Sequence, residues 1–369
     1  MFVHGKALNA VSVRQNGRVV CLAERPRGSG GTARIKPAWA GTDELLSKLT
    51  NLLIQTPWVY RILKKQAKAV MVRTAASRGI DWSGCAAALE EAGVSKYFAP
   101  RTDLVYPAYY TKPFHAYDEG NLCWLAAYEV EPATYAMALR VWPQERELSW
   151  RDAQRRLRHC FLDQVTRFMA DPGDLRIDRV RFTLDVGCGA GISTRFLAEY
   201  LARNIPRDDA LRVLGIDPSP YFLAVANLRN EKANALDVQR LPPNVRIEYQ
   251  QALGESLPLA DSVVDLVTLQ FVLHELPRDA AESVFRELVR VTRDRGCIAM
   301  VDNNPRSPVI QNLPPALFTL MKSTEPHSDD YYTFDVEACL RQIPGIERVQ
   351  VTACDPRHRA ILCRVRKST

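Results

Sequence analysis

The chain has 369 residues, 47% of them hydrophobic and 25% charged, which is typical of a globular protein with enough apolar residues for a substantial core. No apolar run approaches the length of a membrane-spanning helix, so we expect no integral membrane segment. The net charge is +7, but residues 1–36 hold seven basic residues and one acidic residue. The remainder is close to neutral, which argues against a nucleic-acid partner.

Residues 1–36 resemble a targeting leader. They contain no acidic residue before Glu24, are rich in arginine and end in a Gly/Ser stretch, which are features of an organelle transit peptide. The segment predicts plastid localisation, and the alternative is a disordered basic tail on a cytoplasmic protein. The nine cysteines form no CxxC pair and no metal-binding spacing with histidine. They therefore predict neither a disulfide framework nor a metal site.

Residues 37–174 predict a mainly helical region that caps the rest of the chain. Thr56-Pro57 marks the start of a helix and Gly79 its end. A second helical block begins at Ser149, with Asp152 in the acidic third position of a capping box. Four apolar residues then recur at helical spacing and predict a buried face: Leu157, Phe161, Val165 and Phe168.

Between the helical blocks, residues 106–124 are aromatic and interrupted by proline, with no clean period. We expect a loop. Its rings with polar tips, Tyr109, Tyr110, His115 and Tyr117, suit a flat or cationic ligand. The alternative is a structural aromatic cluster that ties the N-terminal helices to the core.

From residue 175 to 369 the pattern alternates between strands and helices, which predicts an α/β domain with a doubly wound, mostly parallel sheet. Two final strands with a tight connection predict an antiparallel hairpin at the sheet edge. The expected strands are 181–186, 211–217, 245–250, 264–270, 297–302, 347–353 and 359–365, and the expected helices are 192–204, 220–233 and 278–291.

The first of these strands leads into the loop of TLDVGCGAGIST, residues 183–194. Ligands bind beyond the carboxyl ends of the strands in such sheets. The spacing of Gly187, Gly189 and Gly191 departs from the dinucleotide fingerprint, which has two residues between its last glycines. The next strand ends in Asp217, whose carboxylate suits the two hydroxyls of a ribose. The alternatives are a packing turn without a ligand for the glycines and a helix cap for Asp217.

Together with GIDPS and GESLPLADSVVDLVTLQFVLHELP, this loop resembles class I S-adenosylmethionine-dependent methyltransferases. The resemblance covers about 180–369, and it is to the small-molecule branch that includes the quinone-biosynthesis enzymes. The chain is also similar to uncharacterised plastid and cyanobacterial methyltransferase-like proteins. The resemblance implies a Rossmann-like seven-stranded sheet and S-adenosylmethionine as cofactor. It assigns cofactor binding to Asp185, Gly187, Cys188, Gly189, Gly191, Asp217, Pro218, Ala252, Leu253 and Gln270.

One position departs from the family pattern. Relatives usually carry an Asp four residues before the Leu-Pro pair, where it receives the adenine amino group. This chain has Leu253 there, preceded by Ala252. We therefore expect backbone groups and apolar packing to hold the adenine, with Glu255 nearby.

Methyl transfer needs alignment of donor and acceptor, and a base only where the acceptor must lose a proton. His274, just past the fourth strand, is the first candidate base, although it can equally pack structurally; Tyr110 and His115 are further candidates. Residues 314–335 are expected to complete the acceptor pocket. The sequence thus predicts methyl transfer to oxygen or carbon of a small lipophilic or aromatic metabolite.

Two alternatives to this function remain open. One is a methyltransferase fold without catalysis, serving as a scaffold or a sensor of S-adenosylmethionine. The other is a protein or RNA methyltransferase. No oligomeric state follows from the sequence.

Overall fold

The computed structural model describes residues 12–15, 18–21, 36–37, 39–40, 48, 56–171, 175–206, 208–232 and 240–367. Within the predicted leader, strands β1 (Ser12–Gln15) and β2 (Arg18–Cys21) pair antiparallel, and nearly all of its other residues lie outside the described ones. Among the described residues, no helix has the length and apolar character needed to span a membrane.

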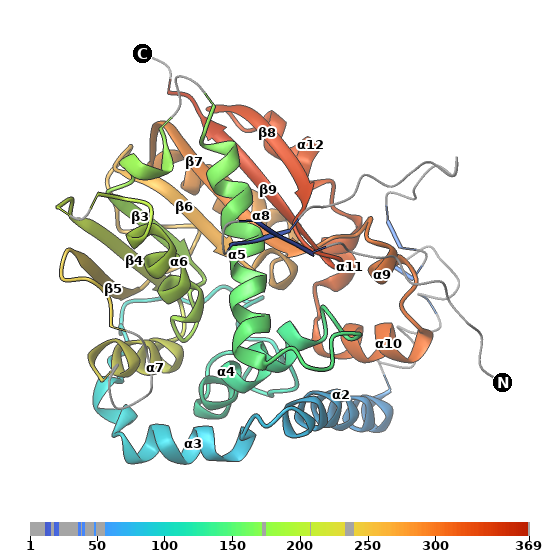
Figure 1. The fold of residues 1–369 in the computed structure, drawn as a ribbon. Coiled ribbons are helices and arrows are strands. Elements are labelled where there is room, and N and C mark those ends of the chain that lie inside the picture. The colour runs from blue at the N-terminus through green and yellow to red at the C-terminus, as the bar shows by residue number, and fades with distance from the viewer. Residues whose placement is uncertain are drawn as a thin grey trace.

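A seven-stranded sheet forms the centre of the molecule (Figure 1). Five neighbouring strands are parallel, and β9 runs antiparallel to both of its neighbours, β7 and β8. This confirms the predicted mostly parallel sheet with a C-terminal antiparallel hairpin at its edge. The spatial order is β5 (Val245–Gln251), β4 (Leu211–Asp217), β3 (Phe182–Val186), β6 (Val264–Gln270), β7 (Thr292–Asn303), β9 (His358–Val365) and β8 (Ile346–Ala353).

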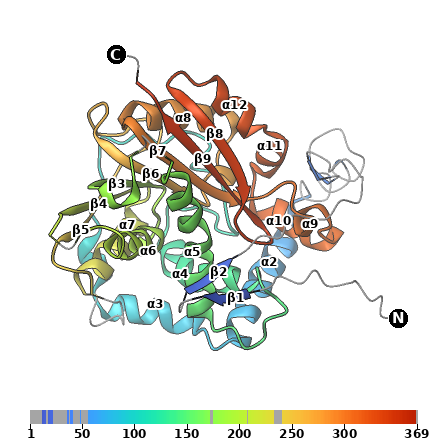
Figure 2. The ribbon, with the colours of Figure 1, turned by 45° about the horizontal axis from the view of Figure 1, so that its top comes forward.

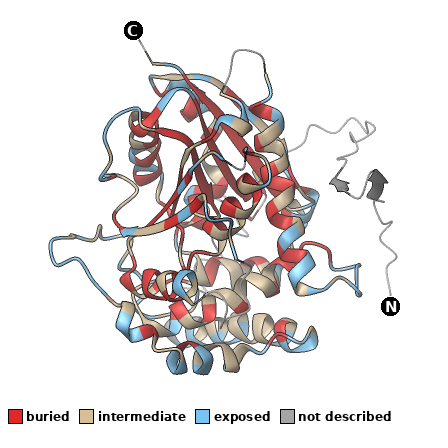
Figure 3. Ribbon diagram, turned by 60° about the vertical axis from the view of Figure 1, so that its left-hand side comes forward, coloured by how far each residue is buried: buried red, intermediate tan, exposed pale blue. Residues whose placement is uncertain are grey.

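Helices cover both faces of the sheet, so its central strands are buried and mostly apolar. Every residue of β6 and β9 is buried, and Figure 3 shows the middle of the sheet mostly in the colour of buried residues. Successive side chains of a strand point to opposite faces. On β7, Ile298 and Met300 therefore join one core, whereas Ala299 and Val301 join the other. The first core includes α8 (Arg278–Val291) and α12 (Val336–Gln342); the second includes α5 (Trp150–Phe168) and α6 (Ile192–Ala202).

In the described part of the chain, four longer helices precede the sheet, and sequence signals mark where two of them begin. Helix α2 (Pro57–Ser77) has proline in its first turn and ends before Gly79, whose φ is +71°. Helix α3 (Trp82–Glu91) follows, and α5 begins where the Ser149 hydroxyl accepts a hydrogen bond from the Asp152 amide. All four apolar residues expected on the buried face of α5 are buried.

Helix α4 (Trp124–Leu139) was not predicted as a separate element. Residues on several sides of it are buried, and Pro132 lies inside it. Its sequence therefore lacks the one-sided apolar period by which a surface helix is recognised. The segment 106–124 before it forms turns without a long helix or strand, as expected.

The C-terminal half contributes three short helices beside this region: α9 (Pro308–Gln311), α10 (Pro315–Thr324) and α11 (Ser328–Thr333). Helix α10 packs beside α2, and Figure 2 shows the two together at one end of the molecule. Helix α7 (Pro220–Glu231) follows β4 and packs against α4. The N-terminal helices thus face the ends of the strands where a ligand is expected.

Trp39 anchors the chain immediately after the predicted leader. It is 2% exposed, stacks on Phe318 with ring centroids 5.5 Å apart and meets Tyr332 edge-on at 4.7 Å. Its indole Nε1 donates a hydrogen bond to the Ile310 carbonyl at 3.1 Å. Residues 39–40 therefore belong to the folded body.

Candidate active site

Several positions of the loop after β3 can be occupied only by glycine. Gly187, Gly189 and Gly191 have φ angles of +70°, +52° and +78°. Such left-handed backbone is unfavourable for other residues. A Cβ at Gly191 would lie 2.3 Å from the hydroxyl of Tyr249, and one at Gly187 would lie 2.5 Å from a methyl of Val272. The loop consequently lies close against the neighbouring strands.

A cavity of about 450 Å³ lies in front of this loop. This is within the roughly 300–1,000 Å³ of small-molecule sites. Its walls come from the glycine loop, residues 109–117, helices α2 and α4, and helix α10. Both halves of the chain therefore enclose one space.

The cavity wall includes six of the ten residues assigned to the cofactor: Gly187, Cys188, Gly189, Asp217, Pro218 and Gln270. Asp185 lies behind it, where its carboxylate accepts hydrogen bonds from three hydroxyls, those of Ser193, Thr194 and Thr268, at 2.6–2.8 Å. It joins helix α6 and β6 to β3.

The other three assigned residues also lie outside the cavity wall. Gly191 is packed against Tyr249, as above, and Ala252 is buried. Leu253 forms an isolated β-bridge with Ser256, and this turn presents the next two residues, Gly254 and Glu255, to the cavity.

Asp217 is 5% exposed and lines the cavity. Its carboxylate accepts hydrogen bonds from the amides of Gly189 and Ser219, both at 2.8 Å, and from the Tyr110 hydroxyl at 3.4 Å. Burial raises the pKa of Asp217 to about 6. Ser219 provides the cap of α7, because its hydroxyl accepts from the Phe222 amide at 3.3 Å.

A buried arginine, absent from the sequence prediction, borders the same space. Arg158 on α5 donates to the Gln270 side-chain oxygen at 2.8 Å, while the Gln270 amide nitrogen is buried without a partner among the described residues. Burial lowers the pKa of Arg158 to about 10. No described carboxylate forms an ion pair with it, so the site can accept an anionic group. The signal available in the sequence is an arginine beside Leu157 on the buried face of the helix.

At the other end of the cavity, the two candidate histidines face each other. His274 lies in the turn η3 (Leu273–Glu275) after β6, and its Nδ1 is 2.9 Å from a carboxylate oxygen of Asp302. Burial lowers the pKa of His274, but the carboxylate of Asp302 outweighs this and the pKa rises to about 10. The ring of His115 is 6.3 Å from that of His274. The enclosed position of the His115 ring in the cavity lowers its pKa, which favours the neutral imidazole.

A family model described as a methyltransferase domain matches residues 184–300, from β3 to β7. This region is therefore a methyltransferase domain. Two proteins named uncharacterised methyltransferases match the chain at 29% identity. The one from Synechocystis sp. matches over 152 residues, and YcgJ from Bacillus subtilis over 128. These matches cover 41% and 34% of this chain, and they span only 61% and 43% of the relatives' own length.

A solved S-adenosylmethionine-dependent methyltransferase from Aquifex aeolicus is also similar to this chain. The match covers 56% of this chain and 92% of the Aquifex chain, at 22% sequence identity and a TM-score of 0.39.

The residues of the methyltransferase domain fit S-adenosylmethionine. A Cβ at Gly189 would meet nothing nearer than Phe222 at 3.9 Å, so the cavity side of the loop has room for a ligand. Asp217 offers a carboxylate for hydroxyl groups, and Arg158 with the unpartnered Gln270 nitrogen offers donors for a carboxylate. The cofactor carries both kinds of group.

Proposed function

We propose that the protein transfers a methyl group from S-adenosylmethionine to oxygen or carbon of a small lipophilic or aromatic acceptor. The observation that carries this is the single cavity shared by the glycine loop of the methyltransferase domain and the N-terminal helices. An acceptor that reaches the donor there must fit between these walls. This favours a small molecule over a protein or RNA chain.

The donor half of the cavity is proposed to work through four groups of this chain. Asp217 accepts hydrogen bonds from the ribose hydroxyls, and the glycine loop lets the cofactor approach the backbone. Arg158 and Gln270 hold the carboxylate at the methionine end. The bound cofactor supplies an activated methyl group on a sulfonium sulfur.

Tyr110 belongs to this donor half. Its hydroxyl donates a hydrogen bond to Asp217. We therefore propose that Tyr110 covers the cofactor and does not act on the acceptor. The neighbouring Tyr109 hydroxyl donates to Glu255, which lines the cavity where the adenine is expected.

The acceptor half has apolar walls and a polar end. The walls include Val70, Met71, Val130, Met137, Leu317 and Leu320, which suit a lipophilic or aromatic body. His115 and His274 form the polar end. Asp302 orients the His274 ring, so we propose that the acceptor's hydroxyl binds here and gives its proton to His274 after the imidazolium has released its own.

Two measurements test this function. Calorimetric titration with S-adenosylmethionine and S-adenosylhomocysteine should show binding of both. Incubation with a labelled methyl donor and a fractionated plastid extract should place the label in a small molecule. No binding at millimolar concentration would refute the enzyme, and label confined to RNA or protein would refute the small acceptor.

Plastid localisation is proposed from residues 1–36 alone. Fusion of this segment to a fluorescent protein should direct it to plastids of plant cells. A diffuse cytoplasmic signal would favour the alternative of a basic tail.

A further inference from the structure

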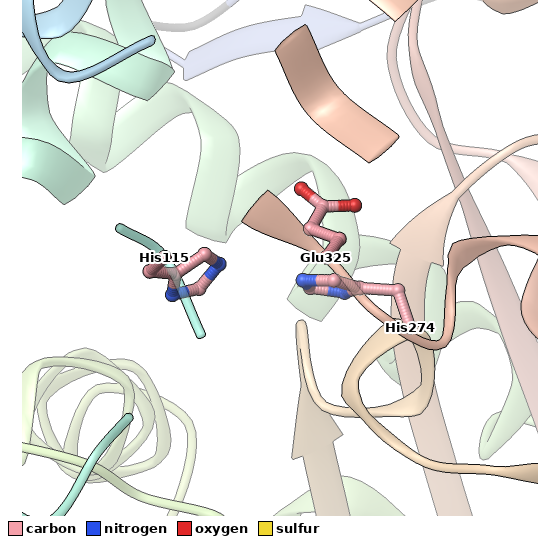
Figure 4. A group of neighbouring side chains, drawn as sticks. All are labelled: His115, His274 and Glu325. Carbon is pink, nitrogen blue, oxygen red and sulfur yellow. The ribbon is translucent and has the colours of Figure 1, made fainter. Parts of the chain in front are cut away.

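Three potential metal ligands converge at the polar end of the cavity. They are His115 from the aromatic loop, His274 from the turn after β6, and Glu325 at the end of α10. Figure 4 shows the His115 ring facing that of His274, with Glu325 beside His274. Their ligand atoms all lie within 4.8 Å of one another.

The backbone holds two of these residues together. The His115 amide donates to the Thr324 carbonyl at 2.8 Å, which fixes His115 next to Glu325. His115 also has a φ of +48°, a left-handed conformation that is unfavourable for residues with side chains. Such strain is concentrated at functional sites. The exposed surface of His115 faces the cavity that it lines.

His274 has the partner typical of a metal-bound histidine. Both carboxylate oxygens of Asp302 lie within 3.0 Å of its Nδ1, and the His274 amide donates to the same carboxylate at 3.1 Å. This leaves Nε2 facing the cavity, where the imidazolium would release its Nε2 proton as a metal ion binds. A carboxylate behind the far nitrogen fixes the ring and the tautomer of a ligating histidine.

The remaining ligand has an unsatisfied atom. Glu325 Oε2 is buried and has no hydrogen-bond partner among the described residues. The ring of His115 makes no hydrogen bond with them either, so one of its ring nitrogens can coordinate an ion. An unpartnered buried carboxylate oxygen costs free energy that a bound cation would recover.

We propose that His115, His274 and Glu325 bind a divalent transition metal ion, with zinc the best match. Two imidazoles and one carboxylate are a known ligand set of catalytic zinc, which keeps one position open. Ligand atoms around tetrahedral zinc lie about 3.4 Å apart, given bonds of about 2.1 Å. The present ligand atoms, all within 4.8 Å of one another, would have to move closer by side-chain rotation when the ion binds.

The role of the ion rests on the proposed function. The acceptor's hydroxyl oxygen takes the open position and releases its proton to solvent, because coordination lowers its pKa. The oxyanion then attacks the methyl carbon of S-adenosylmethionine. The carbon–oxygen bond forms as the carbon–sulfur bond breaks, and the electron pair stays on sulfur in S-adenosylhomocysteine. The ion thereby replaces His274 as the means of ionising the acceptor.

Metal titration of the chelator-treated full-length protein tests the site directly. Calorimetry should detect one equivalent of Zn²⁺, and Co²⁺ should give the absorption of a tetrahedral site without a thiolate charge-transfer band. His115→Ala and Glu325→Gln should each weaken Zn²⁺ binding at least tenfold. Asp302→Asn, which removes the orienting carboxylate, should weaken it roughly 10- to 100-fold. His159→Ala is the matched control, since this part-buried histidine does not line the cavity.

Thermal unfolding of each variant separates loss of binding from loss of fold, and the conservative Glu325→Gln keeps the test open if an alanine variant does not fold. Zn²⁺ binding that survives both His115→Ala and Glu325→Gln, or a cobalt spectrum dominated by thiolate, would overturn the site. Methyl transfer that persists in chelator would overturn its catalytic role and leave His274 as the base. Failure to bind S-adenosylmethionine would instead refute the proposed function, whatever the metal does.

Discussion

Asp217→Asn is the perturbation that most sharply tests the donor half of the site. Ribose hydroxyls donate hydrogen bonds, so the cofactor needs the ionised carboxylate. Burial raises the pKa of Asp217 to about 6, while the amides of Ser219 and Gly189 and the Tyr110 hydroxyl act in the opposite direction. The other titratable groups near it are the acids Asp185 and Glu275, the phenol Tyr106 and the thiol Cys188.

The magnitude follows from this pKa. At pH 5 about one-tenth of the carboxylate is ionised, so the Kd for S-adenosylhomocysteine should be about tenfold higher than at pH 8. A hydrogen bond to a charged group contributes about 1.5–3 kcal/mol, so Asp217→Asn should bind roughly 10- to 150-fold more weakly at pH 8. Its Kd should change little between pH 8 and pH 5, because the variant has no carboxylate to protonate.

The same group has the opposite effect on the stability of the ligand-free protein. Its folded pKa, about 6, lies above the ordinary 3.8. The folded state then binds the proton more tightly than the unfolded state. Asp217 therefore lowers the free energy of unfolding by its full amount above pH 6, and this loss of stability disappears as the pH falls towards 4. The shift corresponds to about 3 kcal/mol.

Calorimetric titration across pH 5–8 measures the binding, and urea unfolding of the ligand-free protein measures the stability. Wild-type affinity that stays constant over this range would refute the assignment of Asp217 to the ribose. The same conclusion would follow if Asp217→Asn kept the pH dependence of the wild type.

Three further substitutions test the loop, the buried arginine and the N-terminal anchor. Gly191→Ala should destabilise the protein by roughly 1–3 kcal/mol in urea unfolding, because the new Cβ would lie 2.3 Å from the Tyr249 hydroxyl. Gly79→Ala is the matched control: Gly79 has a similar φ but no atom within 4 Å of the new Cβ, so the loss of stability should be smaller. Arg158→Met should weaken S-adenosylmethionine binding roughly tenfold or more by calorimetry, and unchanged binding would show that the methionine carboxylate lies elsewhere. Trp39→Ala should lower the unfolding free energy by about 3–5 kcal/mol, and an unchanged urea midpoint would mean that this contact is not stabilising.

The sheet could be predicted from the sequence because its strands are buried on both faces. Such strands appear as short, continuous apolar runs, and β6 and β9 are buried along their whole length. Helix starts could also be predicted where a proline or a capping residue marks them, as at Pro57 and Ser149. Helix α4 was missed because no polar face gives it a period.

The site was only partly predictable, since sequence position does not say which way a side chain points. The glycine loop and Asp217 lie where the fold requires them, but Asp185 turns into the core and satisfies three hydroxyls. The proposed metal ligands lie in segments far apart in the sequence. No short spacing motif connects them, and only the tertiary fold brings His115 beside Glu325.

The two halves of the cavity have different origins, and this bears on the acceptor. Most of the donor half is built from strand ends within residues 184–300, the part that matches the methyltransferase domain family, and Arg158 and Tyr110 complete it. Much of the acceptor half is built outside that range, by residues 109–117, helices α2 and α4, and helix α10. Similarity to other methyltransferases therefore says little about the acceptor of this protein. Substitutions in these outer walls should change which molecule is methylated, whereas those around Asp217 should weaken the donor for every acceptor alike.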